Sequence, residues 1–246
     1  MTVTTLPCRK NSTDGEGQSN WFENHGIPPR YAMATLAELD TKQHVKKLHE
    51  LSKLHADAFA KGERWSERGL FIGGAVGTGK SHCMFAIARE CLLAEERRYK
   101  ARIKSFPGRD HPDYDPQATG RVLGPSDTVA VLTFREFLYR LTQPDSDGNK
   151  FNVPAAVDKL CSARYVFMDD MTVRVNATGN AESPYRWAYD AVNELVDRIW
   201  SDNGNTLLYV TTNNKPTELA SAFGDWCADR ITGICEPVWI TGASFR

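Results

Sequence analysis

The sequence has 246 residues, of which 41% are hydrophobic and 25% are charged, and its formal net charge is −1. This length suits one α/β domain with a short extension, and the near-neutral charge excludes a global field that would attract nucleic acid. No apolar run reaches the roughly 18–20 residues that cross a bilayer, and residues 1–10 lack the apolar stretch of a signal peptide, so we expect a cytoplasmic protein without membrane association.

The N-terminal part of the chain is expected to lead into the core without belonging to it. Residues 1–25 are rich in Ser, Thr, Asn, Gly and Gln, which predicts a flexible tail. A proline-stiffened extended segment, Gly26–Tyr31, comes next, and apolar residues then recur at helical spacing from Leu36 to Lys61. We therefore expect a linker and helix over 26–68 and the main domain over 69–246.

Within the main domain, short apolar runs alternate with helical patterns. The predicted strands span 69–73, 129–133, 165–168, 206–211 and 237–241, and the predicted helices span 81–94, 134–141, 153–162, 185–200 and 217–223. Near-continuous apolar strands between helices are typical of an α/β fold with a parallel sheet covered by helices on both faces. Two polar stretches, 99–127 and 172–183, are expected to be loops.

A phosphate-binding loop follows the first predicted strand. Residues 74–81 read GAVGTGKS and match the pattern G-x-x-x-x-G-K-S/T between a strand and a helix. The glycines let backbone amides face an anion, Lys80 would reach the β- and γ-phosphates, and the Ser81 hydroxyl would bind Mg²⁺. The pattern predicts a site for ATP and Mg²⁺, contacted by Gly74, Ala75, Val76, Gly77, Thr78, Gly79, Lys80, Ser81 and His82.

Two carboxylates end the third predicted strand. Asp169 and Asp170 follow the apolar run Tyr165–Met168, where a P-loop ATPase carries its acidic residues. We expect Asp169 to hold Mg²⁺, directly or through water, and Asp170 to orient or deprotonate the attacking water. The alternative is a pair of turn aspartates that cap the strand.

Two further polar residues are candidates for hydrolysis. Asn213 follows the strand at 207–212, where an amide can bond both the γ-phosphate and the attacking water; the alternative is an Asn-Asn turn. Arg230 is a candidate arginine finger that reaches the site of a neighbouring subunit. The alternative for Arg230 is a surface salt bridge with Asp225 or Asp229.

In this order the motifs resemble those of the AAA+ helicase loaders of the DnaC type and of their relatives, the IstB transposition helpers. The resemblance covers roughly residues 26–246. It rests on Gly26–Tyr31, Ala34–Leu36, Gly69–Ser81, Phe167–Asp170, Val192–Arg198, Thr211–Asn213, Ala228–Arg230 and Gly242–Arg246.

The resemblance implies an AAA+ P-loop ATPase over 69–246 that binds ATP and Mg²⁺, contacts single-stranded DNA and self-associates through its ATP interface. It implies delivery of a hexameric replicative DNA helicase onto that strand during DNA replication. It implies little or no C-terminal lid, since the sequence ends about sixteen residues past Arg230. Carried over by position, Asn213 is sensor 1 and Arg230 is the finger.

The sequence departs from the family pattern in three places. Trp226 or a neighbour stands where the family usually has another arginine before the finger, and the stretches 95–127 and 171–187 are longer than usual. The short N-terminal extension matches no known helicase-binding domain.

Three other functions remain open from the sequence. An IstB-like helper of a DNA transposase would use the same domain on duplex DNA, a small-molecule kinase would share only the loop, and a membrane-linked AAA+ role lacks an anchor. For DNA contact, the candidate is a run of cations with two aromatic residues, which suits a single strand. It comprises Arg97, Arg98, Lys100, Arg102, Lys104 and Arg109, with Tyr99 and Phe106. The alternative is a solvated helix end, partly neutralised by Glu95 and Glu96.

Overall fold

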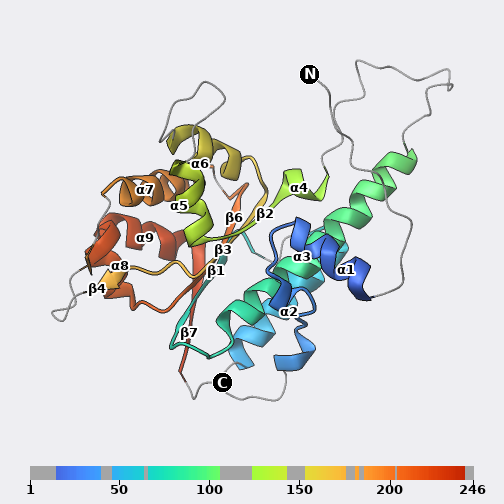
Figure 1. The fold of residues 1–246 in the computed structure, drawn as a ribbon, viewed down its shortest axis with the longest axis horizontal. Helices are drawn as coiled ribbons and strands as arrows, with labels where there is room; N and C mark the ends of the chain where they lie inside the picture. The colour runs from blue at the N-terminus through green and yellow to red at the C-terminus, as the bar shows by residue number, and fades with distance from the viewer. Residues whose placement is uncertain are drawn as a thin grey trace.

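The computed structural model describes residues 15–39, 46–63, 66–105, 124–142, 153–175, 181–182, 186–202 and 204–241. A central sheet separates two groups of helices (Figure 1). Its strands are β1 (Gly69–Gly74), β2 (Val129–Thr133), β3 (Tyr165–Asp169), β6 (Leu207–Thr212) and β7 (Cys235–Ile240). On one side lie α1 (Gly15–Asn24), α2 (Lys46–Lys61) and α3 (Lys80–Ser105). On the other lie α5 (Phe134–Thr142), α6 (Val153–Cys161), α7 (Arg186–Ser201), α8 (Pro216–Phe223) and α9 (Asp225–Ile234).

The sheet is parallel throughout, in the order β2-β3-β6-β1-β7. Its register places Phe71 of β1 opposite Val210 of β6, and Phe167 of β3 opposite Tyr209 of β6. Parallel strands put all their carboxyl ends at one edge, so the loops after β1, β3 and β6 meet there. The predicted α/β class with a sheet covered on both faces is confirmed.

Successive strand residues enter two separate cores. Leu70, Ile72, Tyr165 and Phe167 pack beneath α2 and α3. Their neighbours along the strands face α5–α9, as Phe71 does. A strand buried on both faces needs an apolar residue at every position, which explains the continuous apolar runs in the sequence.

The expected flexible tail over 1–25 is wrong for its last part. Residues 15–24 form α1, and Phe22 is fully buried. The guanidinium of Arg89 on α3 lies 4.9 Å from the centre of the Phe22 ring. One buried aromatic residue thus docks a segment whose composition is otherwise polar. Residues 1–14 lie outside the described part, and the boundaries proposed at 26 and 69 stay predictions.

Helix α3 is longer than the sequence pattern indicated. Residues 99–105 were expected in a loop, but the helix continues to Ser105. Its second half carries pairs of opposite charge one turn apart, Arg98 with Glu95 and Lys100 with Glu96, and such pairs stabilise an exposed helix. A short helix, α4 (Pro125–Thr128), precedes β2, and residues 106–123 lie outside the described part.

Four smaller expectations also need correction. The helix expected from Leu36 to Lys61 is a 3-10 turn, η2 (Ala37–Leu39), followed by α2, and 40–45 are not described. Within 172–183, the two-residue strands β4 (Arg174–Val175) and β5 (Ala181–Glu182) pair antiparallel. Helix α9 was not predicted, and β7 begins at Cys235 rather than Pro237. No helix in the described ranges is both long and apolar enough to cross a bilayer.

Stability is expected to fall in mild acid because of His55. Its ring is buried on α2 and lies 2.9 Å from the Tyr209 hydroxyl, and burial lowers the pKa of His55 from 6.5 to about 4. The unfolded chain binds this proton near pH 6.5, so protonation favours unfolding as the pH falls from 6.5 towards 4. The contribution is about 2 kcal/mol between pH 7.5 and 5.

Urea unfolding at both pH values would measure this effect. The variant His55→Gln should show a smaller loss of stability in acid than the wild type. Equal pH dependence in the two proteins would show that His55 is not the responsible group.

Candidate nucleotide-binding site

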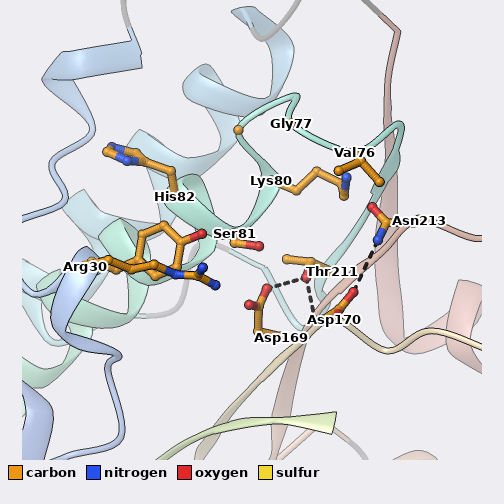
Figure 2. Close-up of a pocket in the computed structure, with 12 residues that line it drawn as sticks. Arg30, Val76, Gly77, Lys80, Ser81, His82, Asp169, Asp170, Thr211 and Asn213 are labelled. Carbon is orange, nitrogen blue, oxygen red and sulfur yellow. Dashed lines mark hydrogen bonds between the residues drawn. The ribbon is translucent and has the colours of Figure 1, made fainter. Parts of the chain in front are cut away.

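A pocket of about 310 Å³ lies at the carboxyl ends of β1, β3 and β6 (Figure 2). It brings together the loop after β1 and the polar residues that end β3 and β6. Its lining comprises Arg30, Tyr31, Val76, Gly77, Gly79, Lys80, Ser81, His82, Asp169, Asp170, Thr211 and Asn213.

The phosphate loop has the backbone that its glycines predict. Gly77 and Gly79 have φ angles of 81° and 89°, in the left-handed region that favours glycine. Thr78 braces the turn, since its hydroxyl donates to the carbonyl of Ala75 at 2.9 Å. Helix α3 begins at Lys80, so its unpaired N-terminal amides and its dipole face the pocket. This arrangement attracts a phosphate group.

Lys80 is held inside the loop. Its Nζ donates to the carbonyl oxygens of Gly74 at 2.8 Å and Ala75 at 2.7 Å. Burial lowers the pKa of Lys80, while the charges of Asp169 and Asp170 oppose that shift. A charged phosphate oxygen is a stronger hydrogen-bond acceptor than a neutral carbonyl oxygen. The ammonium group is therefore positioned to exchange these carbonyl partners for phosphate oxygens.

Asp169 is a buried carboxylate next to Ser81. The Thr211 hydroxyl donates to Asp169 Oδ1 at 2.5 Å. Burial raises the pKa of Asp169, and hydrogen bonds from Thr211 and Ser81 lower it. Two oxygen-bearing side chains, Ser81 and Asp169, therefore meet at one point, and oxygen is the ligand that Mg²⁺ prefers.

Asp170 and Asn213 meet on the opposite side of Thr211. Asn213 Nδ2 donates to Asp170 Oδ1 at 3.2 Å, and the Asp170 amide donates to Thr211 Oγ1 at 2.9 Å (Figure 2). Asp170 has a φ of 56°, a left-handed conformation that costs energy in a residue other than glycine. This turn aims its exposed carboxylate at the pocket, where it can contact water.

Arg230 is not brought to this pocket. It lies within α9, forms an ion pair with Asp197 of α7, and stacks 3.6 Å from the ring centre of Trp226. The expected alternative pairing with Asp225 or Asp229 is wrong, because Asp197 on α7 takes that place. A role in the same subunit's site is therefore not supported, whereas a role in a neighbour's site stays a prediction.

Three residues of the pocket were missed in the sequence. Tyr31, in the 3-10 turn η1 (Pro29–Tyr31), packs against Phe85 of α3 with ring centres 4.7 Å apart, and Arg30 precedes it. Thr211 looked like an ordinary strand residue. The sequence feature that could have identified Thr211 is a polar side chain in an otherwise apolar strand, two residues before Asn213.

The cations expected to contact DNA divide into two groups. Arg98 donates to the Phe59 carbonyl and pairs with Glu95, so it is structural. Arg97, Lys100, Arg102 and Lys104 are exposed. At the amino ends of β2 and β3 lies a second pocket, of about 540 Å³, lined by Glu95, Arg98, Tyr99, Ala101, Arg102, Thr128, Ser162 and Arg164. Phe106 and Arg109 lie outside the described residues.

No family model matches this sequence, and no curated protein matches it either. Solved structures do match. The DnaC helicase loader has 15% identity and a TM-score of 0.56, over 87% of this chain and 100% of that one. DnaI has 18% identity and a TM-score of 0.54, over 89% and 94%. AMPPCP-bound DnaA from Aquifex aeolicus has 15% identity and a TM-score of 0.54, over 87% and 51%. The likeness shows that this chain shares the fold of these proteins.

Proposed function

We propose that this AAA+ domain is a magnesium-dependent ATPase that acts in DNA replication by delivering a hexameric replicative helicase onto single-stranded DNA. The observation that carries the ATPase is the meeting of a complete phosphate loop with Asp169, Asp170 and Asn213 in one pocket. The similarity to DnaC, which extends over the whole of that chain, supports the loader role.

Nucleotide binding would use the loop and the start of α3. The amides of Gly77–Ser81 would hold the phosphates, and Lys80 would exchange its carbonyl partners for phosphate oxygens. His82, whose Nε2 lies 3.2 Å from the Thr35 carbonyl and 3.1 Å from a Glu38 oxygen, closes one side of the pocket.

Ser81 and Asp169 would hold Mg²⁺, which when bound neutralises the charge that develops on the phosphates. The described residues contain no group of three or more His, Cys, Asp and Glu side chains that could hold a metal by themselves. Phosphate oxygens and water would supply the other ligands, as is usual for Mg²⁺. Asp170 and Asn213 would together orient the attacking water and accept its proton.

The loader role is tested with the purified chain, a replicative helicase from the same cell, and circular single-stranded DNA. Helicase should appear on the circle only when the chain and MgATP are both present, and the two proteins should co-purify. Preference for duplex DNA without helicase co-purification would favour the IstB-like transposase helper. Phosphate transfer to a small molecule by a monomer would favour a kinase.

Removal of Arg230 is expected to lower ATPase activity only in the assembled protein. Arg230→Ala should leave MgATP affinity unchanged and reduce turnover roughly 10³-fold at high protein concentration, because the finger acts on a neighbour's nucleotide. Asp197→Asn, which removes only the partner in the same chain, is the matched control and should retain turnover. A defect of equal size in dilute monomer would rule out the finger role.

Reversal of the exposed charges on α3 is expected to weaken binding to single-stranded DNA. Arg97, Lys100 and Lys104 recur at helical spacing, so the triple change to Glu alters one face. Loss of three phosphate contacts should reduce the slope of log affinity against log salt by roughly 2. Filter binding would measure it, with Arg135, Arg140 and Lys159 changed to Glu as the control. Equal affinities of the two variants for single-stranded DNA would show that this face of α3 does not bind it.

A further inference from the structure

The N-terminal segment before the main domain contributes a side chain to the nucleotide pocket. Arg30 lies in η1, and Figure 2 shows its guanidinium pointing inward, towards Ser81 and Asp169. Arg30 and Asp169 line the same pocket, and the charge of the guanidinium acts on the carboxylate. The cation therefore lies within electrostatic range of the expected magnesium and phosphate positions.

The segment that carries Arg30 is fixed to α3, directly behind the phosphate loop. The Tyr31 ring stacks on Phe85, and the Arg30 guanidinium lies 4.7 Å from the centre of the Tyr31 ring. Three residues after Tyr31, the Ala34 carbonyl accepts a hydrogen bond from Arg89 Nη1 at 3.1 Å. A side chain supported in this way is positioned before any ligand arrives, which lowers the entropy cost of a contact.

Among the described residues, no carboxylate forms an ion pair with Arg30. Within the described ranges its guanidinium makes no hydrogen bond, although it stacks on the ring of Tyr31 and its charge acts on Asp169. Arginine groups that stabilise a fold usually have acidic or carbonyl partners, as Arg98 and Arg230 do here. Arg30 instead points its guanidinium into the pocket, and five donors in a planar fork suit phosphate oxygens.

The charges that line the pocket also favour a contact between Arg30 and phosphate. The lining contains two carboxylates, Asp169 and Asp170, and two cations, Lys80 and Arg30, so the formal charges of these four side chains sum to zero. Without Arg30 the side chains would carry one net negative charge, next to a nucleotide that is itself an anion. Arg30 thus adds one positive charge to the lining, which favours an anionic ligand in addition to the charge that bound Mg²⁺ would supply.

We propose that Arg30 binds the phosphate chain of the nucleotide within its own subunit, and that this contact ties the N-terminal segment to nucleotide occupancy. The inference rests on the proposed ATPase function. It adds a phosphate-binding cation from outside the P-loop, and it assigns the segment Gly26–Leu39 a part in sensing the ligand.

The test is a competition assay in which MgATP or magnesium tripolyphosphate displaces a fluorescent ATP analogue. Arg30→Gln should weaken both competitors by the same factor, about tenfold, because the contact is to phosphate and not to the base. Arg30→Lys should recover part of the loss. Arg140→Gln, an exposed arginine change on α5, is the control and should bind like the wild type.

Three outcomes would overturn the inference. Wild-type affinity in Arg30→Gln would show that the side chain does not reach the ligand, and a loss for MgATP alone would indicate a contact to the base. If the wild type binds no nucleotide, the proposed function itself is wrong. Binding by the wild type, loss in Lys80→Ala and no change in Arg30→Gln would contradict only the role of Arg30.

Hydrogen exchange gives a second readout that does not depend on affinity. At saturating MgATP, amides of residues 26–39 should become more protected in the wild type. Arg30→Gln at equal saturation should lack that extra protection while the amides of the phosphate loop keep theirs. Equal protection in both proteins would show that the segment does not respond through Arg30.

Discussion

Replacement of Lys80 by alanine is expected to lower the affinity for MgATP by about a hundredfold or more. The ammonium group is the one cation inside the phosphate loop, and it is already oriented by the carbonyls of Gly74 and Ala75. Its contact with phosphate is charge-assisted and partly buried, so backbone amides alone should not replace it.

Titration calorimetry with MgATP would measure this effect. Lys53→Ala, an exposed change on α2, is the matched control and should bind like the wild type. Thermal unfolding would verify that both variants are folded. Unchanged affinity in Lys80→Ala would refute the nucleotide site, and the functional proposals that depend on it would fall with it.

The second large effect is expected at the end of β3, where two adjacent carboxylates have different roles. Asp170→Asn should keep MgATP affinity and lower the hydrolysis rate by roughly 10²-fold or more, because an amide cannot accept a proton from water. Asp169→Asn should instead remove the magnesium dependence of nucleotide affinity. Binding with and without Mg²⁺, and phosphate release, distinguish the two.

Stability provides an internal check on Asp169. Burial raises the pKa of this carboxyl, so its ionised form is less favourable in the folded protein than in the unfolded chain. That penalty is absent below the ordinary aspartate range and reaches its full size once the pH exceeds the raised pKa. At neutral pH without Mg²⁺, Asp169→Asn should therefore raise the melting temperature, whereas Asp170→Asn, at an exposed site, should change it less. A lower melting temperature for Asp169→Asn would contradict this reading.

Part of the fold and of the site could be predicted from the sequence, because the residues responsible lie close together in the chain. The glycines, the lysine and the hydroxyl of the phosphate loop lie in one contiguous stretch and act together within one turn. The sequence of this stretch is therefore enough to predict a phosphate-binding loop. The parallel sheet was predictable for a similar reason, since strands such as Leu70–Ile72 and Tyr165–Met168 must be apolar on both faces. Asp169 and Asp170 were also predicted at the correct edge of the sheet, because they directly follow the apolar residues of β3.

Only the tertiary structure decided which distant residues meet. Docking on α3 makes a helix of residues 15–24, despite their polar composition, because Phe22 becomes buried. The same docking carries Arg30 into the pocket, and the pairing of β3 with β6 joins Thr211 to Asp169. Arg230 is likewise held by Asp197, far away in sequence. Such contacts depend on burial and on charge pairing between elements that are distant in the sequence, so a local sequence pattern does not predict them.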